Sequence, residues 1–539
     1  MSSSEVKEYD GIVLGAGQHG LILAAYMAKA GLKVLLLERR LQYGGGLSTE
    51  ERTLPGFYHN LHSINHFSIT ATPWYRDLGL SETVEYLTPQ YEFAQPHRDG
   101  SALVFSRDLA ETVENIARFS ARDAQTFREW NLKAEEMTNR IFMKERYAAP
   151  LDAQERAQIL GQSSLGREFL ELTRKQPLPA VQELFENEYV RVLFLFKLSL
   201  FGTVLAEPLD SKGSPVGSLI RAFDLSAGYE LCRGGSWNLA QGVMQRFIAA
   251  GGHYRNQAQV DRIVVENNRA TGVELSTGEL IRARQFVAST LDVHQTFEKF
   301  IGRDQLPAAL RERVDAHRYT PWSLYGLHLA LKDAPNYKAS AFDPALNTAL
   351  KYNIGSETVD SLLTAHHEVE TKKLPGAIQF GAGALSVLDP SQAPAGKHTA
   401  YAWHVVPYDI EGDPDRILDV QDEFADRILD KWREYAPNMT RDNVLGQYIY
   451  TGHQYAQEIV NMHGGDIFMG ALSEDQVMDK HFGYRSAIDG LYMAGSACHP
   501  KGGITGGSGY ISAGVIAQDL SLKPWWTPVD VRNELALLE

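Results

Sequence analysis

Three glycines near the N-terminus have the spacing of a pyrophosphate-binding turn. They stand in the segment Gly15-Ala16-Gly17-Gln18-His19-Gly20. The first glycine of such a pattern permits a tight turn, the second lets the backbone approach a pyrophosphate, and the third lets a helix pack closely on a strand. Glu38 follows eighteen residues after the third glycine, and a carboxylate there can accept hydrogen bonds from both hydroxyls of a ribose. These residues predict a dinucleotide site.

The residues around the glycines have the pattern of a strand, a helix and a second strand. Residues 11–14 form a short apolar run, residues 21–30 are rich in Ala, Leu and Met and end at Gly31, and residues 33–37 form a second apolar run. The N-terminus of the helix would then face the phosphates, where its unpaired N–H groups and partial positive charge attract an anion. Since a GxGxxG pattern alone is a weak signal, these flanking elements carry the prediction.

Two further glycine clusters lie on predicted loops. Gly44-Gly45-Gly46 follows the second strand, and glycines there let the backbone lie against a flat or anionic ligand. Near the C-terminus, residues 490–496 predict a strand, residues 502–507 a glycine-rich turn, and residues 508–520 the helix that follows it.

The composition argues against several classes of function. A formal charge of −15 disfavours a nucleic-acid partner, which would need a basic face. The two cysteines, Cys232 and Cys498, are too few for a disulfide framework, and neither belongs to a CxxC pair, so a reducing compartment is expected. Residues 1–8 lack the basic and apolar regions of a signal peptide. We therefore expect a cytoplasmic protein.

The most apolar segment is Val190–Ala206. It carries Arg191 and Lys197, and its seventeen residues are barely enough to span a bilayer. We expect a buried helix there and no transmembrane segment. The alternatives are a lining for a lipophilic substrate or a surface that dips into a membrane, so peripheral membrane contact stays open.

The rest of the chain interrupts the nucleotide unit twice. Residues 91–227 are expected to be mostly helical. A helix at 237–250, with Ser236 as its N-cap, and three strands within 259–287 then resume the nucleotide domain. From 301 to 461, strand-like runs accompany one amphipathic helix at 415–435, which suggests a sheet that walls a cavity. The strand-like runs are 323–331, 399–406 and 445–450.

Several motifs occur in the same order as in a known family. They are the N-terminal glycine turn, Arg233-Gly234-Gly235 before a helix and a strand meander, Gly464-Gly465-Asp466-Ile467-Phe468-Met469-Gly470 followed by Asp475-Gln476, and His499-Pro500-Lys501-Gly502-Gly503. With these motifs the chain resembles, over nearly its whole length, the FAD-dependent phytoene desaturases and carotenoid isomerases, including relatives called pyridine nucleotide-disulfide oxidoreductase domain proteins. The resemblance implies FAD as the cofactor.

We therefore expect an α/β protein with a Rossmann-type FAD-binding domain built from discontinuous segments and an inserted α+β substrate-binding domain with a sheet and a helical part. The FAD-binding domain would comprise residues 1–90, 228–300 and 462–539, and the substrate-binding domain residues 91–227 and 301–461. The sequence does not specify an oligomeric state.

The resemblance also implies which residues bind the cofactor. The pyrophosphate would lie against Gly15, Gly17 and Gly20, the adenosine part near Glu38, Arg39 and Val260, and the ribityl chain and flavin ring near Gly45, Gly46, Gly495, Ser496, Gly503 and Ile504. Two positions depart from the family pattern. Ser496 stands where many flavoproteins carry an acid, and Lys501 replaces a common glycine.

Four residues are candidates for catalysis. His62, His66 and Tyr510 could donate or accept a proton at the ring face, and Lys501 could place a positive charge near the flavin N1 and C2 carbonyl. Ordinary packing, or for Lys501 a solvated loop position, is the alternative for each. Although His62 and His66 have the i,i+4 spacing of helical metal ligands, no third ligand stands at a diagnostic offset, so no metal site is predicted.

The expected function is an FAD-dependent oxidoreductase of the dehydrogenase or desaturase type that takes hydride from a lipophilic or aromatic small molecule. The alternatives are a redox-neutral FAD-dependent isomerase or hydratase, and a flavin-bound interaction protein without turnover. A second nucleotide fingerprint is missing, because the nearest candidate, Gly381–Ser386, lacks the third glycine. We therefore expect oxygen, a quinone or another diffusible acceptor to reoxidise the flavin, and we expect neither NADH nor NADPH to reduce it.

Overall fold

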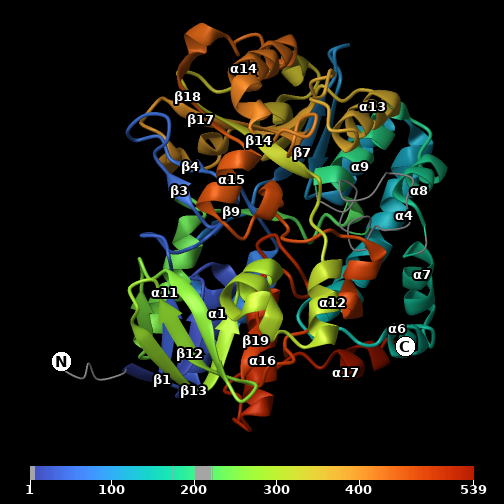
Figure 1. Ribbon diagram of the computed structural model, residues 1–539. Helices are drawn as coiled ribbons and strands as arrows, with labels where there is room; N and C mark the ends of the chain where they lie inside the picture. Colours follow the sequence, from blue (N-terminus) through green and yellow to red (C-terminus); the bar gives the residue numbers. More distant parts are fainter. Residues whose placement is uncertain (1–6, 174, 201–219, 221, 539) are drawn as a thin grey trace.

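The computed structural model describes residues 7–173, 175–200, 220 and 222–538. Two seven-stranded sheets organise these residues. In Figure 1 the first sheet lies in the lower half, around the labels β1, β12 and β13, and the second lies in the upper half, around β14, β17 and β18. A group of helices lies to the right, alongside both.

The first sheet is the expected nucleotide-type sheet. Its strands are, in spatial order, β10 (His253–Arg255), β2 (Val34–Leu37), β1 (Lys7–Leu14), β13 (Leu280–Ser289), β12 (Arg269–Leu275) and β11 (Val260–Glu266), with β19 (Leu491–Met493) also beside β13. Strands β10, β2, β1, β13 and β19 are parallel, whereas β11, β12 and β13 form an antiparallel meander. Val34–Leu37 are all buried, as expected for a parallel strand covered on both faces.

Three helices pack around this sheet. They are α1 (Gln18–Lys29), α11 (Trp237–Ala249) and α16 (Gly507–Asp519), and α1 contacts both of the others. The predicted helices are confirmed, but Ser236 is not a side-chain N-cap. Its hydroxyl donates to the carbonyl of Ser63, and the N–H of Trp237 donates to Thr49 Oγ1 instead. A residue distant in sequence thus supplies the acceptor.

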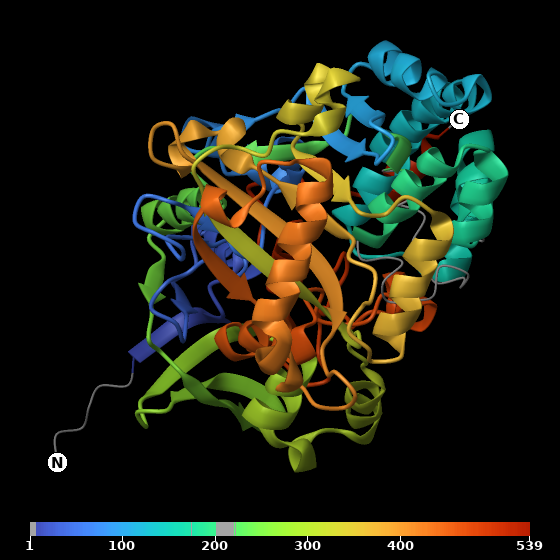
Figure 2. The same cartoon turned by 90° about the horizontal axis from the view of Figure 1, so that it is seen from above.

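The second sheet contains the predicted strand runs. Its order is β18 (Val444–Tyr450), β14 (Trp322–Leu331), β17 (His398–Pro407), β16 (Phe380–Gly383), β15 (Lys351–Ile354), β7 (Tyr91–Pro96) and β8 (Ala102–Ser106), and only β15 and β7 pair in parallel. The amphipathic helix α14 (Arg416–Tyr435) lies across one face, as Figure 2 shows. The other face carries Tyr401 and Trp403, which line a cavity.

The segment expected to be mostly helical begins with two strands. Residues 91–106 form the hairpin β7–β8, in which Phe93 lies opposite Phe105, so the helical prediction was wrong there. The turn signal Asp99-Gly100 between two apolar runs marks this hairpin in the sequence. Helices do follow: α3 (Leu109–Ala117), α4 (Ala121–Met137), α5 (Met143–Arg146), α6 (Ala153–Leu160), α7 (Ser164–Leu172), α8 (Pro177–Leu184) and α9 (Glu188–Leu200).

The apolar segment is a buried helix in its described part. Leu193, Leu195 and Leu198 of α9 are fully buried, and residues 201–206 lie outside the described residues. Within residues 7–538, apart from the gaps given above, no helix is long and apolar enough to cross a membrane.

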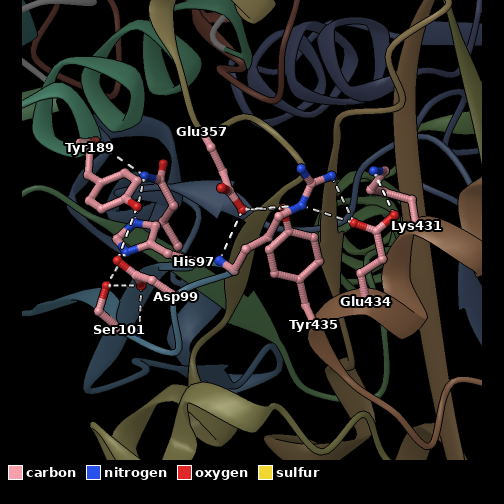
Figure 3. Close-up of polar contacts among 10 residues, drawn as sticks. His97, Asp99, Ser101, Tyr189, Glu357, Lys431, Glu434 and Tyr435 are labelled. Carbon is pink, nitrogen blue, oxygen red and sulfur yellow. Dashed lines mark hydrogen bonds and ion pairs between the residues drawn. The ribbon is translucent and has the colours of Figure 1, made fainter.

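A polar network fastens the β7–β8 turn to neighbouring helices (Figure 3). The rings of His97 and Tyr189 stack with their centres 3.7 Å apart, and Tyr189 donates to Asp99. On the other side, Arg98 Nη2 donates to Glu434 of α14 at 2.8 Å. This network ties α9 and α14 to the hairpin and so fixes the edge of the second sheet.

Candidate active site

Residues of both sheets line one cavity of about 520 Å³. One end lies at the carboxyl ends of the parallel strands, where Leu14, Leu37 and Thr290 line it. This edge of an open parallel sheet is the usual place for a ligand. The other end is lined by side chains of the second sheet, among them Lys351, Tyr401 and Trp403.

The glycine turn has the geometry that its spacing predicts. Gly15 has φ +91°, and a Cβ added to Gly20 would stand 1.9 Å from the carbonyl oxygen of Gly15, so only glycine permits this approach of α1 to the turn. A Cβ on Gly17 would have only the Cα of Gly45 within reach, at 4.0 Å. Gly15 and Gly17 line the cavity, while Gly20 packs behind them.

The second glycine cluster lies directly against the first. The N–H of Gly44 donates to the carbonyl of Ala16 at 2.8 Å, and Gly44 pairs with Gly17 as an isolated β-bridge. Gly45 and Gly46 line the cavity. The two clusters therefore form one continuous backbone surface without side chains, which a flat or anionic ligand can approach closely.

Glu38 is fixed at the end of β2. Its Oε2 accepts the N–H of Ala16 at 3.0 Å, and its Oε1 accepts the N–H of Arg40 at 2.9 Å. The carboxylate lines the cavity. Arg39 also lines it, while its Nη2 donates to the carbonyl of Glu458 at 2.8 Å.

The predicted residues from the middle and end of the chain also gather here. Val260, Ser496, Gly503 and Ile504 line the same cavity. Gly495 does not, because it is packed against Thr290: an added Cβ would lie 2.3 Å from the Thr290 carbonyl oxygen.

The side chain of Gln18 connects the start of α1 to the C-terminal turn. Its Nε2 donates to the carbonyl of Gly503 at 2.7 Å, and its Oε1 accepts the N–H of Gly506 at 3.0 Å. Gly503 thus lies beside the glycine turn, although nearly five hundred residues separate them in sequence.

The parts of this cavity fit FAD. The glycine surface leaves room for a pyrophosphate at the N-terminus of α1, and a fixed carboxylate stands at the end of β2, where a ribose is bound in Rossmann-type sites. Gly503 and Ile504 precede α16, whose N-terminus offers a second partial positive charge.

His62 and His66 both line the cavity; His66 is buried and His62 is partly buried. The Nδ1 atom of His66 lies 2.5 Å from the hydroxyl oxygen of Tyr86, and its Nε2 has no hydrogen-bond partner. The Nε2 atom of His62 lies 3.3 Å from the hydroxyl oxygen of Tyr450, and its Nδ1 has no partner. Burial lowers the pKa of each histidine to about 3, so both are neutral at neutral pH.

Lys501 is not a solvated loop lysine. It is 2% exposed, and its Nζ donates to the carbonyls of Gly470, at 3.0 Å, and Ala471. Burial lowers its pKa to about 8, against the opposing effect of the carboxylates of Asp466 and Asp475. Lys501 lines the cavity and fastens the 470–471 segment to the turn before α16.

Tyr510 does not lie where a proton donor or acceptor at the ring face is expected. It lies in α16, is 2% exposed, and donates its hydroxyl to the carbonyl of Thr527. Its ring packs edge to face on Tyr26. Tyr510 is therefore a core residue outside the cavity lining.

Sequence reasoning missed the residues at the second-sheet end of the cavity. They are chiefly Phe67, Arg146, Tyr229, Lys351, Tyr401 and Trp403. They come from widely separated segments and share no motif, so no local signal identifies them.

Neither cysteine has the character of a redox centre. Cys232 and Cys498 are both free and buried, and burial raises the pKa of each thiol to about 12. The described part of the chain contains no cluster of three or more His, Cys, Asp or Glu side chains that could hold a metal ion.

The fold and the site define an FAD-dependent oxidoreductase. Residues 20–326 match the family described as flavin containing amine oxidoreductase. The chain belongs to this family, and its cofactor is FAD.

Individual relatives match nearly the whole chain. One limonene dehydrogenase subunit from Castellaniella defragrans is 33% identical, over 98% of this chain and 98% of its own. Pyridine nucleotide-disulfide oxidoreductase domain-containing protein 2 of Rattus norvegicus is 28% identical, over 95% and 94%. A lycopene-forming phytoene desaturase of Paracoccus sp. is 26% identical, over 95% and 97%. The resemblance seen in the sequence motifs is confirmed.

A solved structure supports the fold assignment. The cyclohexylamine oxidase of Brevibacterium oxydans is similar, with a TM-score of 0.58, 17% sequence identity, and coverage of 95% of this chain and 99% of that one. This likeness concerns the fold alone. It confirms the expected α/β class with a Rossmann-type FAD-binding part.

Proposed function

We propose that this protein oxidises a lipophilic or aromatic small molecule by removing hydride from a carbon atom. The observation that carries the proposal is the continuity of the cavity, which runs from the glycine surface to the aromatic side chains of the second sheet. The names of the relatives support it, since limonene dehydrogenase and phytoene desaturase both denote removal of hydrogen from a hydrocarbon.

The residues that hold the cofactor are proposed from their place in the cavity. Gly15 and Gly17 face the pyrophosphate, with Gly20 behind them, and Glu38 and Arg39 lie near the adenosine ribose. The other proposed contacts are Gly45, Gly46, Val260, Ser496, Gly503 and Ile504, with Gly495 supporting the strand end. When bound, FAD supplies an acceptor for a hydride from the substrate.

His66 is the proposed proton acceptor. Removing a hydride from one carbon and a proton from its neighbour forms a C=C double bond, so a desaturation needs a base beside the substrate. His66 lines the cavity, and its imidazole is neutral because burial lowers its pKa. Its Nε2 atom has no hydrogen-bond partner. The proton on Nδ1 then points to the hydroxyl oxygen of Tyr86. His62 is the second candidate, and Lys501 has a positioning role through its two carbonyl contacts.

The proposed electron acceptor is oxygen, a quinone or another diffusible molecule. The segment Gly381–Gly383, the nearest to a second fingerprint, belongs to β16 in the middle of the second sheet. It therefore lacks the strand-to-helix turn that binds a dinucleotide phosphate. Peripheral contact with a membrane, from which a lipophilic substrate or quinone could enter, belongs to the same proposal.

The domain division follows the two sheets. The first sheet takes strands from residues 7–37, 253–289 and 491–493, and the second takes strands from residues 91–106 and 322–450. The sheet to which each segment contributes its strands supports the proposed division. The FAD-binding domain would comprise residues 1–90, 228–300 and 462–539, and the substrate-binding domain residues 91–227 and 301–461.

One experiment tests the proposed reaction. FAD-loaded protein is mixed anaerobically with lipophilic candidates such as monoterpenes and carotenoids, and the flavin absorbance near 450 nm is followed. The proposal requires one of these compounds to bleach the flavin and to be recovered with an additional double bond. Turnover that consumes no acceptor and requires flavin reduced in advance would instead establish a redox-neutral isomerase or hydratase.

A further inference from the structure

An arginine whose side chain makes no hydrogen bond among the described residues lines the cavity near its second-sheet end. Arg146 is the last residue of α5 and is 7% exposed. Its Nη1 atom is buried without a hydrogen-bond partner, and no ion pair formed within the described ranges includes its guanidinium. A guanidinium carries a permanent positive charge and five N–H donors.

Arg146 lies close to two aromatic rings. Its guanidinium carbon lies 5.7 Å from the ring centre of Phe67 and 5.6 Å from that of Phe142, and both rings line the cavity. Such contacts orient the planar cation, but they leave its N–H donors unsatisfied.

A second cation lies at the same end. Phe67 packs edge to face on Tyr229, with ring centres 5.6 Å apart, and Lys351 Nζ lies 3.3 Å from the ring centre of Tyr229. Phe67, Tyr229 and Lys351 line the cavity together with Arg146. Two cationic side chains, Arg146 and Lys351, therefore line this end of the cavity.

Among the described residues, none of the carboxylates that line the cavity is bonded to Arg146. Each is bonded elsewhere: Glu38 to the N–H groups of Ala16 and Arg40, Glu145 to Arg156, and Glu458 to Tyr450. A buried charge without a partner is costly, so a bound anion would satisfy both the charge and the free donors of Arg146.

We propose that Arg146 binds an anionic group, in the simplest case a carboxylate, on an otherwise apolar substrate. This inference rests on the proposed function, because it assigns the class of substrate for the same cavity. The substrate is an amphiphile: its anionic end pairs with the guanidinium, for which the fork of N–H donors suits a carboxylate, and its hydrocarbon part contacts Phe67, Phe142 and Tyr229. The carbon that loses hydride lies further along the cavity.

The test compares decanoate with decanol as probes of equal length. FAD-loaded protein is titrated with each probe below its micelle concentration, and binding is followed through the change in the visible spectrum of the flavin. We expect wild type to bind decanoate at least tenfold more tightly than decanol. Arg146→Gln should lose that preference while keeping its affinity for decanol, and Arg146→Lys should keep part of it. Arg122→Gln, which removes an exposed arginine on α4, is the control for net charge.

Several outcomes of this titration would contradict the proposal. Equal affinity of wild type for the two probes, absence of decanoate binding, or a preference that persists in Arg146→Gln would each overturn the proposal. A lower reduction potential in Arg146→Gln with an unchanged decanoate preference would assign the cation to the reduced cofactor instead. Selective decanoate binding without bleaching by any lipophile would support the anion site and remove the proposed oxidation, so the two proposals fail separately.

Discussion

The carboxylate of Glu38 accepts a hydrogen bond from the backbone N–H of Ala16, with 3.0 Å between Oε2 and N. Ala16 lies between the first two glycines of the turn after β1, and Glu38 directly follows β2, the parallel neighbour of β1. The acid and the turn are thus held as one unit, so the proposed ribose and pyrophosphate positions are fixed relative to each other.

Replacing Glu38 with Ala should weaken FAD binding about ten- to a hundredfold. Hydrogen bonds to a charged group contribute about 1.5 to 3 kcal/mol, and 1.4 kcal/mol corresponds to a tenfold change in affinity. The dissociation constant is measured by titrating apoprotein with FAD and following flavin fluorescence. Glu129→Ala, which removes an exposed glutamate from α4, serves as the control. An unchanged constant in Glu38→Ala would contradict the assignment of this carboxylate to the ribose.

Replacing Gly17 with Val should abolish FAD binding. Its Cα faces the cavity, and a branched side chain there would displace a pyrophosphate by more than a hydrogen bond tolerates. Gly514→Val is the matched control, because a Cβ on Gly514 in α16 meets no atom within 4 Å. Full flavin occupancy in purified Gly17→Val protein would show that the pyrophosphate lies elsewhere.

The clustering of residues at the glycine-turn end of the cavity could be predicted because these residues form a local pattern. Gly15 and Gly17 shape a backbone turn and Glu38 follows a strand, and all three stand within fewer than forty residues of the sequence. Arg146 and Tyr229 could not be predicted in this way. They reach the cavity only through tertiary packing of α5 and β9 (Tyr229–Cys232), and neither element carries a periodicity that marks a lining residue.

Side-chain roles expected from residue type alone depend on tertiary packing in the same way. Ser236 has the residue type of an N-cap, but Thr49, in the short strand β3 (Thr49–Glu50), accepts the N–H of Trp237. Tyr510 has the type of a proton donor, but its position in α16 directs the hydroxyl to Thr527. Residue type specifies which bonds a side chain can make, whereas the neighbours brought by folding decide which bonds it does make.

The contribution of Lys501 to stability should increase with pH. Burial lowers its pKa from 10.5 to about 8, so between these values the folded chain holds fewer protons at this group than the unfolded chain. The free energy of unfolding of wild type relative to Lys501→Met should therefore rise from pH 8 toward pH 10.5, by up to about 3 kcal/mol. Urea unfolding at pH 7, 8, 9 and 10 measures the difference, with Lys175→Met, an exposed lysine, as the baseline. A flat or falling difference would refute the prediction.

Replacing His66 with Phe should slow flavin reduction by the substrate roughly a hundredfold or more, the usual contribution of a positioned general base. FAD affinity should stay unchanged, because the imidazole is assigned to the substrate and not to the cofactor. Anaerobic stopped-flow absorbance measures the rate. His62→Phe is the matched comparison, since both histidines line the cavity and have a pKa lowered to about 3. Equal rates in wild type and His66→Phe would transfer the role to another group.

Neither NADH nor NADPH should reduce the bound FAD at a useful rate. Flavoprotein reductases that use nicotinamide commonly carry a second glycine fingerprint or a redox-active pair of cysteines. Here Gly381–Gly383 forms part of the central strand β16, where an added Cβ on Gly383 would lie 2.6 Å from the ring of Tyr401, and both cysteines are buried with a raised pKa. The cavity is instead lined with aromatic side chains at its second-sheet end.

Anaerobic mixing of FAD-loaded protein with each nucleotide at micromolar concentration should leave the flavin spectrum oxidised, while oxygen or a soluble quinone should restore the oxidised spectrum of dithionite-reduced protein. Rapid bleaching by either nucleotide alone would identify the protein as a reductase.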